Sequence, residues 1–149
     1  MDTNPVPIGI VKSSVTGLKK VSKDNWETTI SEIIINDDLE EALDQIESFS
    51  HIIVIYWMHQ ISPSQRMLMK VHPKGNKNLP LVGVIATRSP SRPNPIGITT
   101  VRLLERSGNV LKVIGLDAVD GTPILDLKPY IPGYDCPSDA KTPGWIKPE

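Results

Sequence analysis

Apolar residues recur along the chain in short runs rich in Val and Ile, and turn-forming residues separate these runs. Alternating or continuously apolar short runs of this composition are typical of β-strands. The run "IIVIYWM" at 52–58 is apolar throughout, which predicts a core strand, either buried on both faces or central in a barrel. The pattern predicts seven strands, at 6–12, 26–36, 49–58, 79–87, 98–106, 109–119 and 122–130.

One segment, "DDLEEALDQIESF" at 37–49, has helical spacing instead. Asp38 and Glu41 suit a capping box at its start. The stretch 59–78 mixes basic residues with Pro, Gly and Asn, which predicts a long exposed loop with one helical turn at 64–69. Because strands and helices do not alternate regularly, we expect a mainly β fold: an antiparallel barrel or sandwich with one short helix and an irregular C-terminal tail.

The length and composition favour one soluble domain. A chain of 149 residues suits a single domain over 1–149, with its core at 6–132 and a tail at 133–149. Its one cysteine, Cys136, cannot form an intrachain disulfide, and no residues have metal-site spacing. The N-terminus does not resemble a signal peptide, and no apolar run is long enough to span a bilayer. We therefore expect a cytoplasmic protein without a metal and without a membrane partner.

The net charge of −1 conceals a strong asymmetry along the chain. Residues 48–104 contain no Asp or Glu, whereas both flanking segments are acidic. A block of this kind is typical of a surface that binds phosphate or another anion, although acidic flanks could also fold beside it. Its basic residues are Arg66, Lys70, Lys74, Lys77, Arg88, Arg92 and Arg102.

The stretch "ATRSPSRPNPIG" at 86–97 is unusually stiff for a loop, because each proline fixes its own φ and restricts the preceding residue. A preorganised loop can present Arg88, Arg92 and Asn94 to a planar anion with little loss of entropy. Gly97 allows the chain to enter the next strand at a close approach. The alternative is a rigid connection between strands with no ligand.

A second motif, "DAVDGTPILDLKPYIP" at 117–132, combines a predicted turn at Asp120–Gly121 with a strand. Alternation along an extended strand divides the run into two faces. The first holds Thr122, Ile124, Asp126, Lys128 and Tyr130, and the second holds Pro123, Leu125 and Leu127. The first face could bind a polar small molecule, or it could face solvent with a neutralising Asp126–Lys128 pair, and the second face is expected in the core.

These motifs together resemble the TsaA-like, or TrmO, family of tRNA methyltransferases. The resemblance rests on "GVIATRSPSRPNPIGITTVRLL" (83–104) and "LDAVDGTPILDLKPYIP" (116–132), with support from "PIGIVKS" (7–13) and "IESFSHIIVIYWMH" (46–59). It implies a small antiparallel β-barrel that binds S-adenosylmethionine and works as a homodimer with sites near the subunit interface. It also implies N6-methylation of threonylcarbamoyladenosine, the modified adenosine 3′ of the anticodon in certain tRNAs.

The resemblance also implies site residues. For the cofactor it implies His59, Gln60, Arg88, Ile98, Asp120, Gly121, Thr122 and Pro123. Contacts with RNA or substrate are expected from Arg92, Asn94, Lys70, Lys74 and Lys77, which would meet the anticodon stem-loop. The chain departs from the family near its N-terminus, where a Gln-containing stretch has no match in 13–26.

The acceptor nitrogen is conjugated to a carbonyl, so removal of its proton would help methyl transfer. Asp126 and Tyr130 are the candidates for accepting that proton. Two other functions stay open: a non-catalytic module that binds an anion or a peptide partner through the proline-rich loop, and an S-adenosylmethionine-dependent methyltransferase of another small nucleophile.

Overall fold

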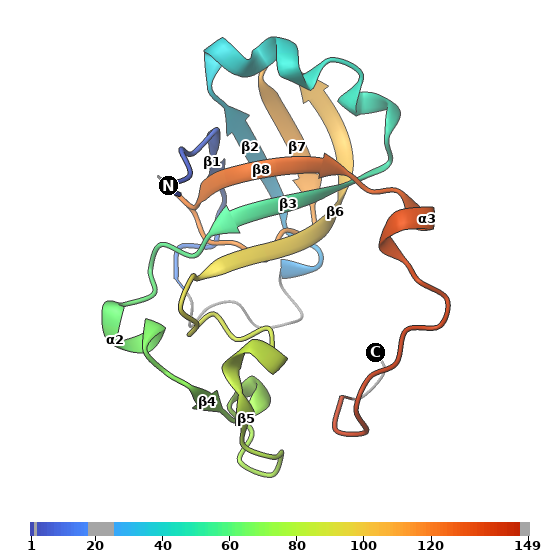
Figure 1. Cartoon of the computed structure of the whole chain (residues 1–149). Coiled ribbons are helices and arrows are strands. Elements are labelled where there is room, and N and C mark those ends of the chain that lie inside the picture. Colours follow the sequence, from blue (N-terminus) through green and yellow to red (C-terminus); the bar gives the residue numbers. More distant parts are fainter. Residues whose placement is uncertain (2, 18–25, 147–149) are drawn as a thin grey trace. The chain divides into compact units, whose positions relative to one another are not determined.

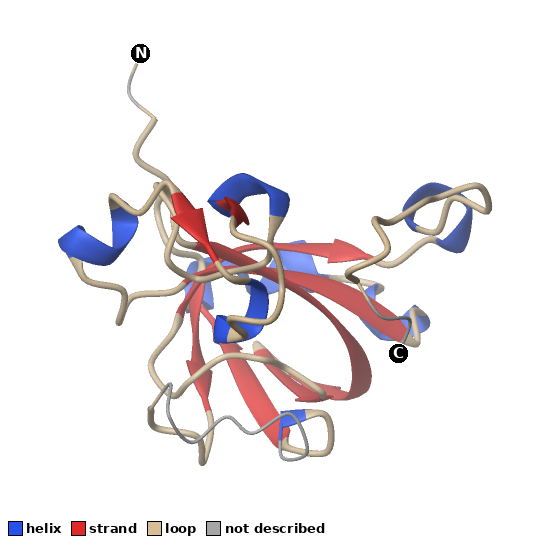
Figure 2. Cartoon of the chain, turned by 90° about the horizontal axis from the view of Figure 1, so that it is seen from below, coloured by secondary structure: helices blue, strands red, loops and turns tan. Residues whose placement is uncertain are grey.

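The apolar runs pair with one another and close into a barrel. In this computed structural model, which describes residues 1, 3–17 and 26–146, the strands pair antiparallel in the order β1-β2-β7-β6-β3-β8, and β8 pairs again with β1. Figure 1 shows β3, β6 and β8 side by side, and Figure 2 shows the strands curving around a common interior. The predicted antiparallel β-barrel is confirmed. Its strands are β1 Gly9–Lys12, β2 Ile30–Ile35, β3 His51–Trp57, β6 Ile96–Ser107, β7 Val110–Ile114 and β8 Pro123–Pro129.

Contacts divide the chain into two compact units. Met1–Gln60 and Ile96–Tyr130 form the first unit, which holds the barrel, and Ile61–Pro95 with Ile131–Glu149 form the second. The prediction of a single domain over 1–149 therefore stays a prediction. The elements outside the barrel are short: η2 Asp37–Leu43, η3 Ile46–Ser48, α2 Pro63–Arg66, β4 Lys70–Val71, η4 Pro73–Gly75, β5 Val82–Gly83, η5 Val84–Ala86 and α3 Pro132–Asp135.

The barrel interior is filled by apolar side chains, most of them aliphatic, which alternate with outward ones along β2 and β7. Burial of such side chains is the main favourable term in folding, about 25 cal/mol for each Å² of apolar surface removed from water. The central strand predicted at 49–58 supplies three of them, which confirms its place in the core. The buried cluster contains Val11, Ile33, Ile35, Ile52, Val54, Tyr56, Val101, Leu111, Val113, Leu116 and Ile124.

The helix predicted at 37–49 is not an α-helix. The segment forms two 3-10 helices, η2 and η3, and Gln45 between them has a left-handed backbone with φ +70°. The predicted capping box of Asp38 and Glu41 is also absent. The helix begins two residues earlier than that capping box implies, after Asn36, whose side chain makes no capping hydrogen bond.

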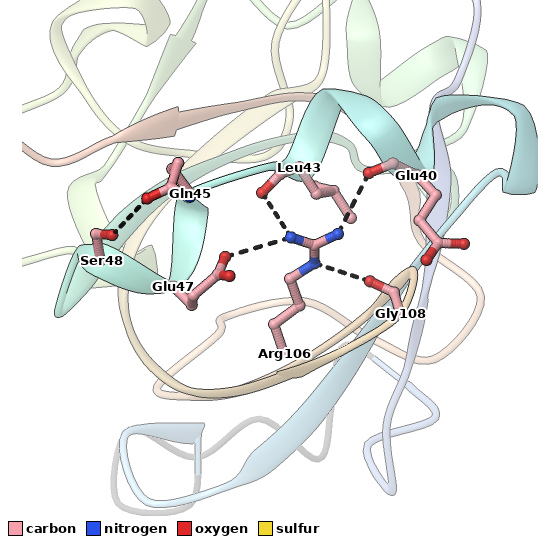
Figure 3. A network of polar contacts seen from close by, with 7 residues as sticks. All are labelled: Glu40, Leu43, Gln45, Glu47, Ser48, Arg106 and Gly108. Carbon is pink, nitrogen blue, oxygen red and sulfur yellow. Dashed lines mark hydrogen bonds and ion pairs between the residues drawn. The ribbon is translucent and has the colours of Figure 1, made fainter.

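Arg106 of β6 contacts the carbonyl end of η2, as Figure 3 shows. Its guanidinium donates hydrogen bonds to the carbonyl oxygens of Leu43 (3.2 Å), Glu40 (3.5 Å) and Gly108 (2.9 Å). The first two carbonyls are three residues apart, and carbonyls at the end of a helix need partners from elsewhere. Arg106 also pairs with Glu47 at 3.3 Å. A backbone hydrogen bond and then this arginine hold the pKa of Glu47 below its ordinary value.

The strand predicted at 79–87 is mostly absent. Only Val82–Gly83 is extended and paired, and it pairs with Lys70–Val71 in a two-stranded sheet separate from the barrel. Pro80 has no N–H to donate, and the Thr87 hydroxyl and N–H both donate to the Val84 carbonyl, which closes a turn in place of a strand. The strand predicted at 109–119 ends at Ile114, because Gly115 has φ +89°.

The predicted division of β8 into two faces is wrong at its start. Ile55 pairs with Asp126 but the next residue, Tyr56, pairs with Ile124, so the chain bulges between these positions. A bulge shifts the alternation by one residue. Ile124 and Thr122 are therefore buried, although the alternation placed them with Asp126 on the polar face.

The C-terminal tail, predicted to be irregular, begins within the short helix α3 and is irregular from 136 to 146. Within the described ranges, no helix combines the length and apolar character needed to cross a bilayer. The same residues contain no group of three or more His, Cys, Asp and Glu side chains that could hold a metal ion.

Candidate functional site

The barrel unit presents a tight turn where β8 begins. Thr122 closes the turn, since its N–H and its hydroxyl both donate to the Val119 carbonyl, at 3.2 and 2.7 Å. Gly121 occupies it with φ +77°, a conformation that glycine adopts without strain. The Gly121 N–H donates to the Val11 carbonyl at 2.8 Å and the Asp120 N–H donates to the Val15 carbonyl at 2.6 Å. The turn predicted at Asp120–Gly121 is thus confirmed, and it is fastened to the N-terminal segment.

The Asp120 side chain strengthens this connection. One of its carboxylate oxygens accepts the Ser13 N–H at 2.9 Å. The Ser13 hydroxyl oxygen accepts the Val15 N–H at 3.2 Å and a hydrogen bond from the buried Ser31 hydroxyl at 3.3 Å. Ser13 and Ser31 were not predicted, because nothing in a run of hydroxyl residues indicates which of them meets a turn more than a hundred positions later. Of the segment 13–26, in which the family's Gln-containing stretch has no match, residues 18–25 lie outside the described residues.

His59 and Gln60 reach the same region from the end of β3. A Cβ placed on Gly121 would lie 4.0 Å from the His59 Nε2 atom, so the imidazole lies next to the turn. Gln60 Nε2 donates to the Thr16 carbonyl at 3.4 Å. Both side chains are exposed. The fold therefore brings together His59, Gln60, Asp120 and Gly121, four residues that the family resemblance assigned to the cofactor.

The other expected cofactor residues of the barrel unit lie in different surroundings. Thr122 is buried and its hydroxyl is used within the turn. Pro123 begins β8 opposite Ile10 of β1. Ile98 lies on β6 opposite Ile55, with 49 % of its surface exposed.

The two candidates for proton acceptance are separated from the His59 region along the barrel. Asp126 forms an ion pair with Lys128 at 2.9 Å, and its other carboxylate oxygen accepts the Leu127 N–H. Its hydrogen bond and its charge raise the pKa of Lys128. The neutralising pair considered as an alternative is thus present. Tyr130 donates its N–H to the carbonyl of His51, at the start of β3, whereas His59 follows the end of that seven-residue strand.

The second unit contains the proline-rich loop. Arg88 is exposed and, among the described residues, makes no hydrogen bond or ion pair. Arg92 is half-buried and donates from Nη1 to the carbonyl oxygens of Thr87 (3.0 Å) and Ser89 (3.4 Å). Asn94 is exposed. The two predicted anion-binding arginines therefore differ: Arg88 faces outward, and Arg92 holds its own loop.

The basic residues expected to contact RNA lie on and beside the small sheet. Lys70 is in β4, Lys74 is in η4 with φ +57°, and Lys77 follows η4; all three are exposed. The described residues 61–95 thus carry a concentrated positive charge with no acidic residue among them.

A protein-family model described as the tRNA-methyltransferase O N-terminal domain matches residues 10–136. The chain belongs to this family. The match covers both long motifs of the sequence analysis, the barrel and the proline-rich loop.

Relatives and solved structures agree with this membership. An S-adenosyl-L-methionine-binding protein of Archaeoglobus fulgidus is 44 % identical over 131 residues, which cover 87 % of this chain and 91 % of that protein. A mouse protein, tRNA (adenine(37)-N6)-methyltransferase, is 40 % identical over 100 residues, 67 % of this chain and 23 % of its own length. A crystal structure of TrmO shares 32 % identity with a TM-score of 0.79, covering 99 % of this chain and 66 % of that one.

Several relatives in the family are longer than this chain. A crystal structure of TrmO from Pseudomonas aeruginosa is 29 % identical, with a TM-score of 0.75. The match covers 96 % of this chain and 61 % of that chain. A second archaeal relative, 40 % identical and named a probable S-adenosyl-L-methionine-binding protein of Archaeoglobus fulgidus, is matched over 37 % of its length. In both cases the match spans less than two thirds of the relative's own length.

Proposed function

We propose that this chain transfers a methyl group from S-adenosylmethionine to the N6 atom of an adenosine in tRNA. The observation that carries the proposal is the cluster of His59, Gln60, Asp120 and Gly121, which joins two motifs about sixty positions apart in the sequence. The names of the family relatives support it: one is an S-adenosyl-L-methionine-binding protein and another is a tRNA (adenine(37)-N6)-methyltransferase.

The residues present fit the proposed cofactor. S-adenosylmethionine has a carboxylate and an ammonium group, together with a ribose and an adenine. The second carboxylate oxygen of Asp120 accepts no hydrogen bond from a described residue, so it suits an ammonium group or a ribose hydroxyl. Gly121 has no side chain to block approach to the His59 imidazole. In the second unit, the exposed guanidinium of Arg88 suits the carboxylate.

The bound cofactor supplies an electrophilic methyl group on a sulfonium centre. The chain's own residues then have to orient the donor and the acceptor nitrogen and exclude water, because methyl transfer to nitrogen needs no covalent intermediate. We keep Asp126 and Tyr130 as the candidates for accepting the N6 proton. Asp126 has Lys128 as its ion-pair partner, so it would have to exchange that contact for the acceptor.

We propose threonylcarbamoyladenosine, 3′ of the anticodon, as the acceptor. Such a base lies in a single-stranded loop, where a protein can reach its edges without opening a duplex. Lys70, Lys74 and Lys77 would contact phosphates of the anticodon stem-loop. We further propose a cytoplasmic homodimer with sites near the subunit interface, as the family resemblance implies.

A second function has a specific observation in its favour. The archaeal relative matched over 91 % of its length is named only for binding S-adenosyl-L-methionine, with no acceptor. A methyltransferase of another small nucleophile would keep the Asp120 and His59 region but would not need the basic residues of 66–77. A non-catalytic binding module would need neither tRNA nor methyl transfer.

Calorimetric titration of the protein with S-adenosylmethionine tests the cofactor assignment. We expect saturable binding, and the Arg88→Ala variant should raise the dissociation constant at least about tenfold, which corresponds to about 1.4 kcal/mol of binding free energy. Arg102→Ala is the matched control, since Arg102 is an exposed arginine of the same basic block but lies on the barrel. If the unaltered protein shows no binding, the proposed function is wrong. If Arg88→Ala binds as well as Arg102→Ala, Arg88 is not a cofactor residue.

A further inference from the structure

The proline-rich loop is held from within by its own side chains. The Thr87 hydroxyl oxygen accepts the Ser89 N–H at 3.1 Å, and the Ser89 hydroxyl oxygen accepts the Ser91 N–H at 3.3 Å. Arg92 crosses back to the Thr87 and Ser89 carbonyls. These bonds define the shape of residues 87–92, but none of them ties the loop to another element at its far end.

Arg66 makes a hydrogen bond to the loop from another element. Its Nε–H donates to the carbonyl oxygen of Pro93 at 3.0 Å, across 27 positions of sequence. Pro93 lies between Arg92 and Asn94, and only Pro95 separates Asn94 from β6. The contact therefore fixes the C-terminal half of the loop.

The position of Arg66 is itself well defined. It is the last residue of α2, and a complete capping box fixes the first turn of that helix. The Gln65 N–H donates to the Ser62 hydroxyl oxygen at 3.3 Å, and the Ser62 N–H donates to Gln65 Oε1 at 2.9 Å. A capping box satisfies two otherwise unpaired N–H groups and so orders a short helix. A rigid element thus presents Arg66 to the loop.

We propose that Arg66 is a positioning residue for anion binding by the proline-rich loop. It acts through the Pro93 carbonyl and keeps the loop in the one shape in which Arg88 is presented outward. This inference rests on the proposed function, in which Arg88 binds the carboxylate of S-adenosylmethionine. Preorganisation of this kind increases affinity because the loop loses less entropy when the ligand binds.

The rival role for Arg66 is a direct charge contact with an RNA phosphate, because it belongs to the same basic block as Lys70. Side-chain chemistry separates the two roles. Glutamine places its Nε2 donor as many bonds from Cα as the arginine Nε, but without charge. Methionine has similar length with neither donor nor charge, and lysine keeps the charge while its nitrogen lies one bond further out.

The experiment compares Arg66→Gln, Arg66→Met and Arg66→Lys with the unaltered full chain. Three quantities are measured: the dissociation constant for S-adenosylmethionine, the salt dependence of tRNA binding, and the hydrogen-exchange rates of the Ser89 and Ser91 amides without cofactor. We expect Arg66→Met to weaken cofactor binding by about fivefold or more and to speed exchange at both amides. Arg66→Gln should stay within about twofold of the unaltered chain in cofactor affinity and in amide exchange rate. These factors follow from the loss or retention of one hydrogen bond to a carbonyl.

Two outcomes would overturn the proposal. One is unchanged cofactor binding and amide exchange in Arg66→Met. The other is that Arg66→Lys behaves like the unaltered chain, whereas Arg66→Gln and Arg66→Met lose cofactor affinity equally and both reduce the salt slope of tRNA binding. That result would make Arg66 a phosphate contact. If Arg66→Met does not fold, comparison of Arg66→Gln with Arg66→Lys decides between the two roles. The amide exchange needs no cofactor, so failure of the unaltered chain to bind S-adenosylmethionine would refute the proposed function and leave this measurement valid.

Discussion

Gly97 shows how a single residue is dictated by its neighbour. A Cβ placed there would lie 2.3 Å from the Tyr56 ring, which faces it across the β3–β6 pair. That ring is fixed at its far end, where the hydroxyl donates to the Asp117 carbonyl at 2.6 Å and bonds the Thr99 hydroxyl at 3.0 Å. The close approach predicted from "NPIG" is therefore confirmed, and its cause is an aromatic ring that the sequence pattern could not identify.

Gly97→Ala should lower the free energy of unfolding by about 2 kcal/mol, because the added methyl group overpacks a buried contact that cannot relax. Gly83→Ala is the matched control. Its Cβ would meet nothing within 4 Å, and the backbone, with φ −58° and ψ 137°, accepts alanine. We expect a change within about 0.5 kcal/mol there. Urea unfolding of both variants measures the difference, and equal stabilities would contradict this account of Gly97.

At the scale of elements, the departures from the predicted structure involve contacts that no local pattern shows. The segment 37–49 is helical as predicted, but it forms two 3-10 helices, and Arg106, more than sixty positions away, donates to the Leu43 carbonyl at the end of the first. The faces of β8 depend on a bulge set by its pairing with β3. Arg92 donates to the nearby Thr87 and Ser89 carbonyls, and its role in binding stays a prediction. Such contacts leave no periodic signal in the sequence.

Arg106→Met should destabilise the protein by about 1.5–3 kcal/mol, because the carbonyls of Glu40 and Leu43 lose a charged donor. The arginine side chain is only 16 % exposed, so water replaces it incompletely. Glu47→Gln removes the ion pair but leaves those bonds intact, and we expect a clearly smaller loss because that carboxylate is exposed. Thermal unfolding distinguishes the two variants. A larger effect of Glu47→Gln would show that the ion pair, and not the carbonyl contacts, stabilises η2.

At the scale of the whole molecule, residue patterns predicted the central strand, the Asp120–Gly121 turn and an antiparallel barrel or sandwich, because strands and turns depend on local residue types. The family resemblance implied the barrel. It also predicted the acid-free basic block, whose lysines lie exposed in the second unit. The contacts of Ser13 with Asp120 and of Ser31 with Ser13 were not predictable, since they depend on how the barrel closes. The family resemblance therefore supplied the residues of the candidate site, and tertiary contacts determine which of their polar groups are already hydrogen-bonded.

Replacing Lys70, Lys74 and Lys77 together with glutamine should weaken tRNA binding and reduce its salt slope by about 2, as expected when three phosphate contacts are lost. Cofactor affinity should not change. Filter binding across a salt series measures the slope. An unchanged slope would remove these lysines from the RNA contact. The matched control replaces three lysines outside the basic block: Lys12, Lys112 and Lys141.

The central claim is methyl transfer to a modified adenosine of tRNA, and mass spectrometry of nucleosides tests it most directly. Unfractionated tRNA that carries threonylcarbamoyladenosine without the methyl group is incubated with the full chain and S-adenosylmethionine, and its nucleosides are compared before and after. We predict that the threonylcarbamoyladenosine signal falls while a species heavier by one methylene rises in its place. An unchanged nucleoside profile, from protein that binds S-adenosylmethionine in calorimetry, would contradict the claim.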